Sequence, residues 1–295
     1  MPELRIAFVT YHRYRMLSDD DRLAVEALED LGIDVEPAVW DDPGVRWEAF
    51  DAIVVRSCWD YFRDPARFRR WIDAVEATGV PVWNPPALLR WNMDKRYLRE
   101  LEARGVAVPP TVWLERGADG AAVAGAMRER GWDDVVVKPA VSADGNSTWR
   151  VRGRDAGRYD AELAAAAARG AVMVQRFIPE LAAEGEWSCV FISGDFSHAV
   201  LKRPAEGEFR VQERFGGTAA AARAPEALVD GARHALRQAP GDDWLYARVD
   251  GVMLGGAFTV IELEMLEPSL FFARDDAAPA RFARALAERL GRRPV

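Results

Sequence analysis

The chain has 295 residues, of which 49% are hydrophobic and 29% charged, so it is long enough to bury a substantial core in two or three lobes. Asp and Glu number 47 against 39 for Lys and Arg, which gives a formal net charge of -8, and no basic run resembles a nucleic-acid-binding surface. The composition therefore predicts a soluble globular protein and argues against DNA or RNA as its main partner.

The cysteines and the N-terminus point to a cytoplasmic protein. Cys58 and Cys189 stand in no CxxC or Cys/His spacing of the kind that binds zinc or forms a redox pair. Residues 4–10 form a strand-like run with no basic leader before it, and no apolar stretch approaches the length of a membrane span. We expect no export signal and no membrane anchor.

The first ninety residues alternate strand and helix patterns. Strands are predicted at 4–10, from 33, at 52–56 and at 80–83, with helices at 19–31 and 65–77. This alternation favours a parallel sheet covered by helices. The segment Asn84-Pro85-Pro86 interrupts the strand and helix pattern and indicates the end of this unit. Residues 1–90 are therefore predicted to form an N-terminal parallel α/β domain.

The rest of the chain is predicted to form two further lobes of α+β type, at 91–178 and 179–295. The first would contain helices 94–104, 119–130 and 160–168 and strands 111–114, 135–138, 148–151 and 172–177. The second would contain strands 187–193, 196–202, 244–253 and 257–265 and helices 225–238 and 279–290. Gly194-Asp195 fits a hairpin turn, and 219–222 is interpreted as a mobile connection or a helix start.

Acidic residues gather on the last two predicted strands. Glu262 and Glu264 are two residues apart, so their side chains leave the same face of the sheet, and Asp250 lies on the preceding strand. Carboxylates this close repel one another unless a hard cation such as Mg²⁺ lies among them. A solvated strand face is the alternative. Arg248 shares the face of Asp250 and would meet phosphate oxygens or form a plain ion pair.

Two lysines are candidates for phosphate contacts. Lys138 ends an apolar strand just before Pro139, and the loop at 141–148 that follows contains Gly145, whose backbone can turn N–H groups toward an anion. Lys95 follows Asp94 at the start of a predicted helix. An ordinary turn and a surface lysine are the alternatives.

Other constellations are weaker or absent. The connector at 175–178 could offer backbone groups to a flat base, or be a simple interdomain linker, and Arg210 is a further phosphate candidate. The sequence contains no GxxxxGK[ST], GxGxxG, HExxH or GxSxG motif, and its three histidines have no recognisable partner.

Taken in order over about residues 84–270, these pieces resemble the ATP-grasp superfamily in its glutathione-synthetase-like branch. The N-terminal turn and two later motifs resemble, within it, the cyclo-ligase type of cycloserine biosynthesis. The matching pieces are Trp91-Asn92-Met93-Asp94-Lys95, Val135-Val136-Val137-Lys138-Pro139, the 141–148 loop, 174–180, Gly185-Glu186, Phe209-Arg210-Val211, Arg248-Val249-Asp250 and Glu262-Leu263-Glu264, and for the cyclo-ligase type 55–61, Asn84-Pro85-Pro86 and 262–268.

The resemblance implies an ATP-grasp fold after an N-terminal α/β domain, and a role for each matching residue. Lys95 and Lys138 would contact the phosphates of ATP, and a lid would cover them. Arg210 and Arg248 would steady the transferred phosphoryl group. The remaining implied groups are the lid residues Ser142, Gly145, Asn146 and Ser147, the adenine-holding residues Gln175, Arg176, Phe177 and Ile178, a ribose contact at Glu186, with Glu180 and Glu184 as competitors, and the Mg²⁺ ligands Asp250, Glu262 and Glu264, with Mn²⁺ as an alternative ion.

One position departs from the family pattern. Many ATP-grasp ligases carry Asn at the position that matches Glu264, so this site holds an additional negative charge. The extra charge would tighten metal binding or change which metal ions are bound.

The acyl substrate is expected at the turn that follows the strand at 52–56, since ligands in open α/β sheets bind beyond the carboxyl ends of strands. Arg56 would pair with a substrate carboxylate and Asp60 with an amine, with Ser57 and Tyr61 beside them. An internal Arg56–Asp60 pair is the alternative. Cys58 fits a packed thiol better than a nucleophile.

Residues and resemblance together predict an ATP-dependent ligase that activates a small-molecule carboxylate as an acylphosphate for attack by an amine, within one molecule or between two. Charge balance and alignment carry such a reaction, so no nucleophilic side chain is required. A kinase-like enzyme and a non-catalytic nucleotide-binding module are the competing classes. Relatives include dimers, so a homodimer is one expectation.

Overall fold

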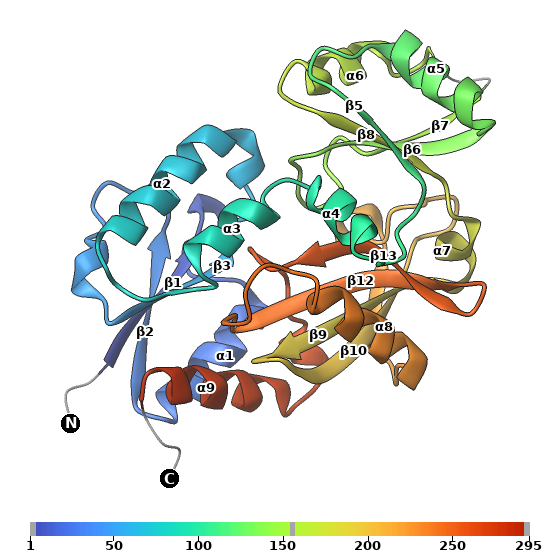
Figure 1. The fold of residues 1–295 in the computed structure, drawn as a ribbon. Helices are drawn as coiled ribbons and strands as arrows, with labels where there is room; N and C mark the ends of the chain where they lie inside the picture. The colour runs from blue at the N-terminus through green and yellow to red at the C-terminus, as the bar shows by residue number, and fades with distance from the viewer. Residues whose placement is uncertain (1–3, 154–156, 292–295) are drawn as a thin grey trace.

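The computed structural model describes residues 4–153 and 157–291, which form three sheets that each draw their strands from one stretch of the chain (Figure 1). The strand orders are β2-β1-β3-β4, β5-β8-β6-β7 and β11-β10-β9-β12-β13. The predicted mixed α/β fold, with a parallel sheet at the N-terminus, is confirmed.

The N-terminal lobe is a parallel sheet with helices around it. Capping explains where two helices begin: the side chain of Ser18 accepts from the Asp21 amide at the start of α1, and Asp64 accepts from the Arg67 amide at the start of α2. Helix α3, which starts at a proline, was not expected from the sequence. The elements are β1 Leu4–Thr10, α1 Asp19–Glu29, β2 Ile33–Val39, β3 Ala52–Ser57, α2 Pro65–Ala77, β4 Val82–Trp83 and α3 Pro86–Asn92.

The small lobe is an antiparallel sheet with two helices on one face, at the top of Figure 1. Val123 and Met127 of α5 and Leu163 of α6 pack on Val135 and Val137 of the sheet. Helix α4 Tyr97–Ala103 precedes this lobe in the chain and packs in the core of the large sheet with Val249 and Leu263. The elements of the small lobe are β5 Thr111–Leu114, α5 Gly120–Arg130, β6 Asp134–Pro139, β7 Trp149–Arg152, α6 Asp160–Ala167 and β8 Val172–Arg176.

The large lobe is an antiparallel five-stranded sheet. Ser193 and Gly194 have φ of 51° and 93° and turn β9 into β10, so the expected hairpin is present, with its turn one residue earlier than the predicted Gly194-Asp195. The segment interpreted as a mobile connection or helix start is instead strand β11, because it pairs with the outer edge of β10. The elements are α7 Pro179–Glu184, β9 Glu186–Ile192, β10 Asp195–Arg203, β11 Thr218–Ala221, α8 Glu226–Leu236, β12 Tyr246–Leu254, β13 Ala257–Glu264 and α9 Ala278–Arg289.

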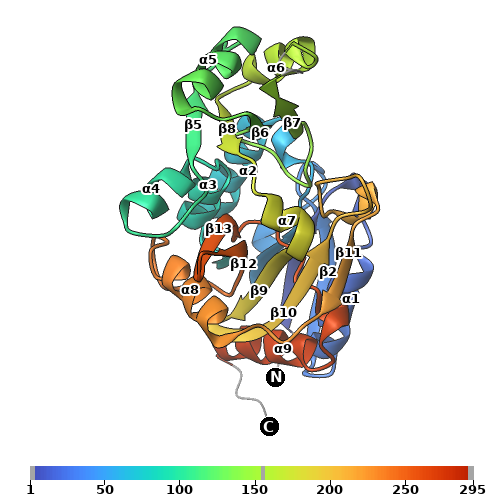
Figure 2. The ribbon, with the colours of Figure 1, turned by 90° about the vertical axis from the view of Figure 1, so that its right-hand side faces the viewer.

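One apolar core joins the first lobe to the last. Helix α9 packs on α1 and on strands of the large lobe (Figure 2). Phe282 of α9 is fully buried, with its ring edge-on to Phe8 at 6.2 Å and to Phe272 at 5.4 Å. The N-terminal and large lobes therefore fold against each other as one body. No helix within the described residues is long and apolar enough to cross a membrane.

We expect Phe282→Ala to lower the free energy of unfolding by about 4 kcal/mol, because it opens a cavity in this shared core. Urea denaturation would measure the change. The matched control is Met16→Ala, a large apolar side chain that is 70% exposed, which should stay within about 0.5 kcal/mol of the parent protein. A loss below about 1 kcal/mol for Phe282→Ala would contradict the shared core.

Candidate active site

Charged side chains gather on one face of the large sheet. The antiparallel register places Arg248 opposite Glu264 and Asp250 opposite Glu262, and Asp250 also opposite Ser188 of β9. Directly paired residues project to the same side of a sheet, so these five side chains share one face. On the opposite face apolar side chains of the same strands pack under α8. The alternation thus separates a charged face from a core face.

Arg248 bonds to acidic side chains of both β12 and β13. Its guanidinium donates to Asp250 at 2.9 Å and to Glu264 Oε1 at 2.6 Å, and its Nη1 donates to the Ser269 carbonyl at 2.9 Å. Both Arg248 and Asp250 are buried. A buried bidentate pair of this kind fixes both groups in place. Ser188 Oγ donates a further hydrogen bond of 2.6 Å to Asp250.

Lys202 of β10 is a central cation of this face that the sequence reasoning missed. Its buried Nζ lies 3.1 Å from Asp250 Oδ2 and also forms an ion pair with Glu186. The hairpin register sets Lys202 opposite Glu186. The sequence contained a signal for this pair. Lys202 ends an apolar strand, and the hairpin turn before that strand pairs it with the preceding strand, which begins at the acid Glu186.

Lys95 and Lys138 reach the same face from the small-lobe side. Lys95 lies in the turn between α3 and α4, and its Nζ pairs with Glu262 Oε1 at 2.9 Å and donates to the Ser142 carbonyl at 2.5 Å. Lys138 is buried on β6 without an ion pair or side-chain hydrogen bond among the described residues. Burial lowers the pKa of Lys138, against the opposing charge of Glu262. Lys138 is therefore available to an incoming anion.

The carboxylates of the face differ in proton affinity. Burial alone would raise the pKa of Asp250 and of Glu262, but Arg248 and Lys202 around the first, and Lys95 and Lys138 around the second, outweigh it and lower both values. For Glu264 burial prevails over Arg248, and its pKa lies well above the ordinary range. The face therefore combines buried cations with two carboxylates that hold their charge, Asp250 and Glu262, and one that takes up a proton more readily, Glu264.

Oxygen donors suited to a hard cation are present, although they do not converge. Across 4–153 and 157–291, no three acidic, His or Cys side chains are arranged to hold a metal ion. The reason is visible in the ion pairs, since Arg248 draws Asp250 and Glu264 while Lys95 draws Glu262. The donor chemistry and the shared face fit a magnesium-type ion, with side-chain rotation as the change that binding requires.

The predicted lid is a tight loop that touches the segment after β10. Gly145 has φ of +61°, a conformation that favours glycine, and a Cβ there would stand 2.9 Å from Gln212 Oε1, so a larger residue would displace the Gln212 side chain. Asp144 forms an ion pair of 3.0 Å with Arg214. The other predicted lid residues follow the loop: Ser142 is buried, with its Oγ donating to Pro139, and Ser147 donates to Asn146 Oδ1.

The predicted adenine connector leads from β8 to α7. Gln175 is buried and donates to Thr111 Oγ1 at 3.3 Å, Phe177 lies under the Arg150 guanidinium at 3.5 Å, and Ile178 packs against the large lobe. Arg176 points to solvent. Glu186, rather than Glu184 or Glu180, is the glutamate of this region that lies in the ion-pair network of the face, through Lys202.

Arg210 is not brought to the acids. It pairs with Glu208 at 2.7 Å and lies 3.6 Å above the Phe215 ring. With Arg150 and other arginines it lines a pocket of about 440 Å³ between β7 and the loop after β10. Its contact with a phosphoryl group stays a prediction, and Arg248 is the guanidinium that the structure places among the acids.

The N-terminal turn is held internally. Arg56 is buried and pairs with Asp21 at 2.9 Å, not with Asp60, and Ser57 also donates to Asp21. The sequence reasoning missed Asp21, which comes from the first turn of α1, far from Arg56 along the chain. Asp60 accepts from the Trp40 indole at 2.9 Å, and Tyr61 reaches across to the Ser142 carbonyl of the lid at 3.5 Å.

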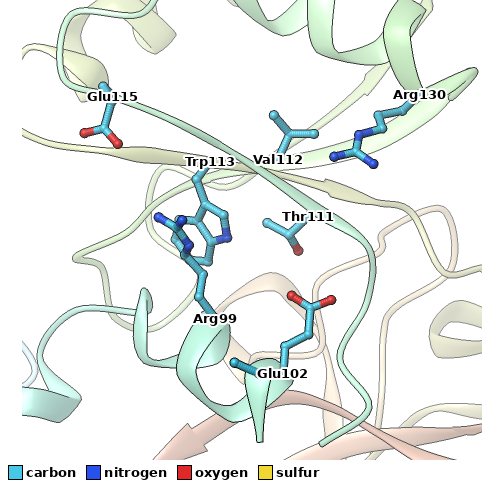
Figure 3. A pocket seen from close by; sticks show the side chains of 8 residues that line it. Arg99, Glu102, Thr111, Val112, Trp113, Glu115 and Arg130 are labelled. Carbon is cyan, nitrogen blue, oxygen red and sulfur yellow. The ribbon is translucent and has the colours of Figure 1, made fainter. Parts of the chain in front are cut away.

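A separate pocket of about 490 Å³ lies between α4 and β5 (Figure 3). Thr111, Trp113 and Arg130 line it together with Arg99 and Glu102 of α4. None of the charged side chains of the large-sheet face contributes to its walls, so this pocket is distinct from the candidate site.

Comparison with known proteins agrees with this architecture. Residues 6–84 match a family model described as the N-terminal domain of the D-cycloserine synthetase DcsG, and residues 120–234 match the ATP-grasp domain of prokaryotic glutathione synthetase. The cycloserine biosynthesis protein DcsG of Streptomyces lavendulae is 33% identical over 281 residues, which cover 90% of this chain and 92% of that protein.

Solved structures show the same similarity in three dimensions. The crystal structure of D-cycloserine synthetase DcsG matches with a TM-score of 0.89 and 31% identity, over 97% of this chain and 99% of that one. A D-alanine–D-alanine ligase from Bacillus anthracis complexed with ATP matches with a TM-score of 0.65 and 17% identity, over 97% of both chains, and shares the fold.

We expect Lys202→Met to lower the free energy of unfolding by about 3 kcal/mol, because it leaves Glu186 and part of the charge of Asp250 buried without a counter-charge. Chemical denaturation at pH 7 would measure this. The control is Arg203→Met, the exposed next residue on the strand, with a change within about 0.5 kcal/mol. The added change Glu186→Gln should restore part of the loss, and equal stability of Lys202→Met and Arg203→Met would contradict the network.

Proposed function

The chain belongs to the ATP-grasp family of ATP-dependent carboxylate–amine ligases, and on that premise we propose that it activates the carboxylate of an amino acid with ATP and closes a ring by intramolecular attack of a nitrogen nucleophile. The observation that carries this proposal is the charged face of the large sheet, where Arg248 and Asp250 lie opposite Glu264 and Glu262. The relatives named for cycloserine support the ring-closing form of the reaction.

The nucleotide would lie between the small lobe and this face. Lys138, which has no side-chain partner within residues 4–153 and 157–291, and Lys95 would contact the phosphates, and the 142–147 loop would cover them. The connector at 175–178 would hold the adenine, and Glu186 would reach the ribose. Burial of these cations supports the assignment, because an anion that replaces water in a low-dielectric site gains more from each contact.

Asp250, Glu262 and Glu264 would hold Mg²⁺, with Mn²⁺ as an alternative. When bound, the ion supplies positive charge that neutralises the phosphate oxygens. The chain's own part is to fix the carboxylates: Ser188 and Lys202 hold Asp250 at 2.6 Å and 3.1 Å. Glu264, where the family resemblance implies Asn, would add a third carboxylate ligand and so tighten metal binding or change which metal ions are bound.

The proposed reaction has two balanced steps. A carboxylate oxygen attacks the γ-phosphorus of ATP, the bond to the β,γ-bridging oxygen breaks, and ADP leaves an acylphosphate. The nitrogen nucleophile then attacks the acyl carbon, loses a proton, and expels inorganic phosphate. Arg248 lies on the face where negative charge develops in both steps and would stabilise it. Cys58 takes no part, because burial raises the pKa of its thiol well above the ordinary value.

Ring closure is a specific form of this chemistry. Cycloserine is a five-membered ring in which the carboxyl carbon of a serine skeleton is bonded to the nitrogen of an aminooxy group on the same molecule. An enzyme of this kind must hold the carboxylate near the γ-phosphate and fold the nucleophile back onto it. The turn with Asp60 and Tyr61 would contact the substrate, since Tyr61 already reaches the lid.

We place the reaction in the cytoplasm, where buried free thiols such as Cys58 and Cys189 stay reduced.

We expect ADP and inorganic phosphate to be released in equal amounts, in the presence of Mg²⁺, only when a suitable carboxylate is added. The panel would contain β-aminooxyalanine of both configurations, amino acids and dipeptides, with coupled ADP and phosphate assays and mass spectrometry of the product. Removal of Mg²⁺ with EDTA should abolish turnover. A stable phosphorylated product would support a kinase instead, and ATP binding without turnover on any acceptor would support a non-catalytic module.

We expect Asp250→Asn and Glu264→Ala each to lower kcat at least about 100-fold while the fold persists, because each removes charge that the reaction requires. Steady-state kinetics and circular dichroism would follow the two effects. Asp195→Asn, an exposed acid at the start of β10, is the control that should keep full activity. Retained activity would remove the altered residue from the site.

A further inference from the structure

Glu267 is a buried carboxylate to which the proposed reaction has so far given no role. It lies three residues beyond the end of β13 and is 6% exposed. No other described residue donates a hydrogen bond to its carboxylate or forms an ion pair with it; its own backbone N–H is the one donor. A glutamate this buried usually has a cation paired with it, and none is paired with Glu267 among the described residues, so its role needs an explanation.

The backbone around Glu267 is fixed by two lobes. The Trp59 indole donates to the Glu267 carbonyl at 2.8 Å, and Arg56 donates to the Pro268 carbonyl at 3.0 Å. Asn84 donates to the Met265 carbonyl at 2.6 Å. Because donors from the N-terminal lobe hold the backbone at residues 265, 267 and 268, the fold fixes where the Glu267 side chain begins.

The surroundings of Glu267 belong to the candidate site. Burial raises its pKa to about 7, Lys95 and Arg248 act against this shift, and Glu262 adds to it. Burial raises the pKa of the Tyr61 hydroxyl well above its ordinary value, and the negative charge of Glu267 adds to this shift. Glu267 therefore lies between the charged face and the N-terminal turn, where the proposed substrate would be.

Neither cation that faces Glu267 is free to neutralise it. Lys95 is engaged by Glu262 at 2.9 Å and by the Ser142 carbonyl, and Arg248 by Asp250, Glu264 and the Ser269 carbonyl. A compact cation with several hydrogen-bond donors, brought by the substrate, would serve as the counter-charge of Glu267. An ammonium group has that chemistry.

We propose that Glu267 binds the ammonium group of the amino-acid substrate and so selects amino acids over other carboxylic acids. This rests on the proposed function, in which the carboxylate that is activated would lie near Arg248. The ammonium held here is not the nitrogen that attacks, since a carboxylate partner keeps it protonated and without a free electron pair. Glu267 would thus orient the substrate and leave a second nitrogen to close the ring.

The test compares two probes that differ only at this group, serine and glycerate, each in both configurations, titrated calorimetrically into the protein with Mg²⁺ and the ATP analogue AMPPNP. We expect one enantiomer of serine to bind at least about 10-fold more tightly than the matching glycerate, and Glu267→Gln to bring that ratio close to one while the affinity for AMPPNP changes less than about twofold. Glu226→Gln, an exposed acid on α8, is the control that should keep the preference.

The remaining outcomes overturn the proposal. They are a preference that survives in Glu267→Gln, glycerate bound as well as serine by the parent protein, or no binding of serine at all. A fall of tenfold or more in Mn²⁺ affinity in Glu267→Gln would make Glu267 a metal ligand instead. If Glu267→Gln does not fold, Glu267→Asp takes its place and should keep the preference, weakened by its shorter reach. Turnover of an amino acid with no effect of Glu267→Gln would contradict this inference alone and leave the ligase function standing.

Discussion

The antiparallel register between β12 and β13 is the constraint on which the site depends. It places Arg248 opposite Glu264 and Asp250 opposite Glu262, so that carboxylates which would repel one another share a face with a guanidinium. Burial of such a group of charges is tolerable only when cations match it. Lys202 comes from β10 and Lys95 from the turn before α4, and the ion pairs that result join segments far apart in the sequence.

The three lobes contribute to this face in different ways. The core around Phe282 fastens the N-terminal lobe to the large sheet, and the polar contacts from Asn84, Trp59 and Arg56 continue that attachment up to the segment after β13. The small lobe brings Lys138 and the lid. Contacts from the other two lobes hold the lid: Tyr61 of the N-terminal lobe and Lys95 donate to the Ser142 carbonyl, and Arg214 after β10 pairs with Asp144.

The sequence indicated much of this arrangement, and the misses have physical reasons. Alternation within a strand is local, because residues two apart project to the same face. The sequence could therefore predict that Glu262 and Glu264 share one face, and that Arg248 and Asp250 do. Lys202 required the pairing of two strands across a hairpin, which the sequence allowed but which alternation within one strand does not show.

Other features depend on contacts between distant segments. Asp21 pairs with Arg56 only because α1 packs beside β3, and no local pattern reveals it. Arg210 was expected at the acids from a motif, but a local acid, Glu208, and the Phe215 ring hold it elsewhere in this structure. Strand β11 was missed because an alanine-rich segment shows no alternation, and its pairing with β10 decides its conformation. Glu267 carries no spacing signal, and it is revealed by its burial without a paired cation in the part of the chain that the structure describes.

The central claim is that the carboxylates of β12 and β13 bind a metal–nucleotide complex. Its most direct test is a Mn²⁺ titration followed by electron paramagnetic resonance with AMPPNP present, on the parent protein and on Glu262→Gln. We expect the parent protein to bind Mn²⁺ at least about tenfold more tightly than Glu262→Gln, because the variant loses a charged ligand. Equal affinities of the two proteins for Mn²⁺ would contradict it.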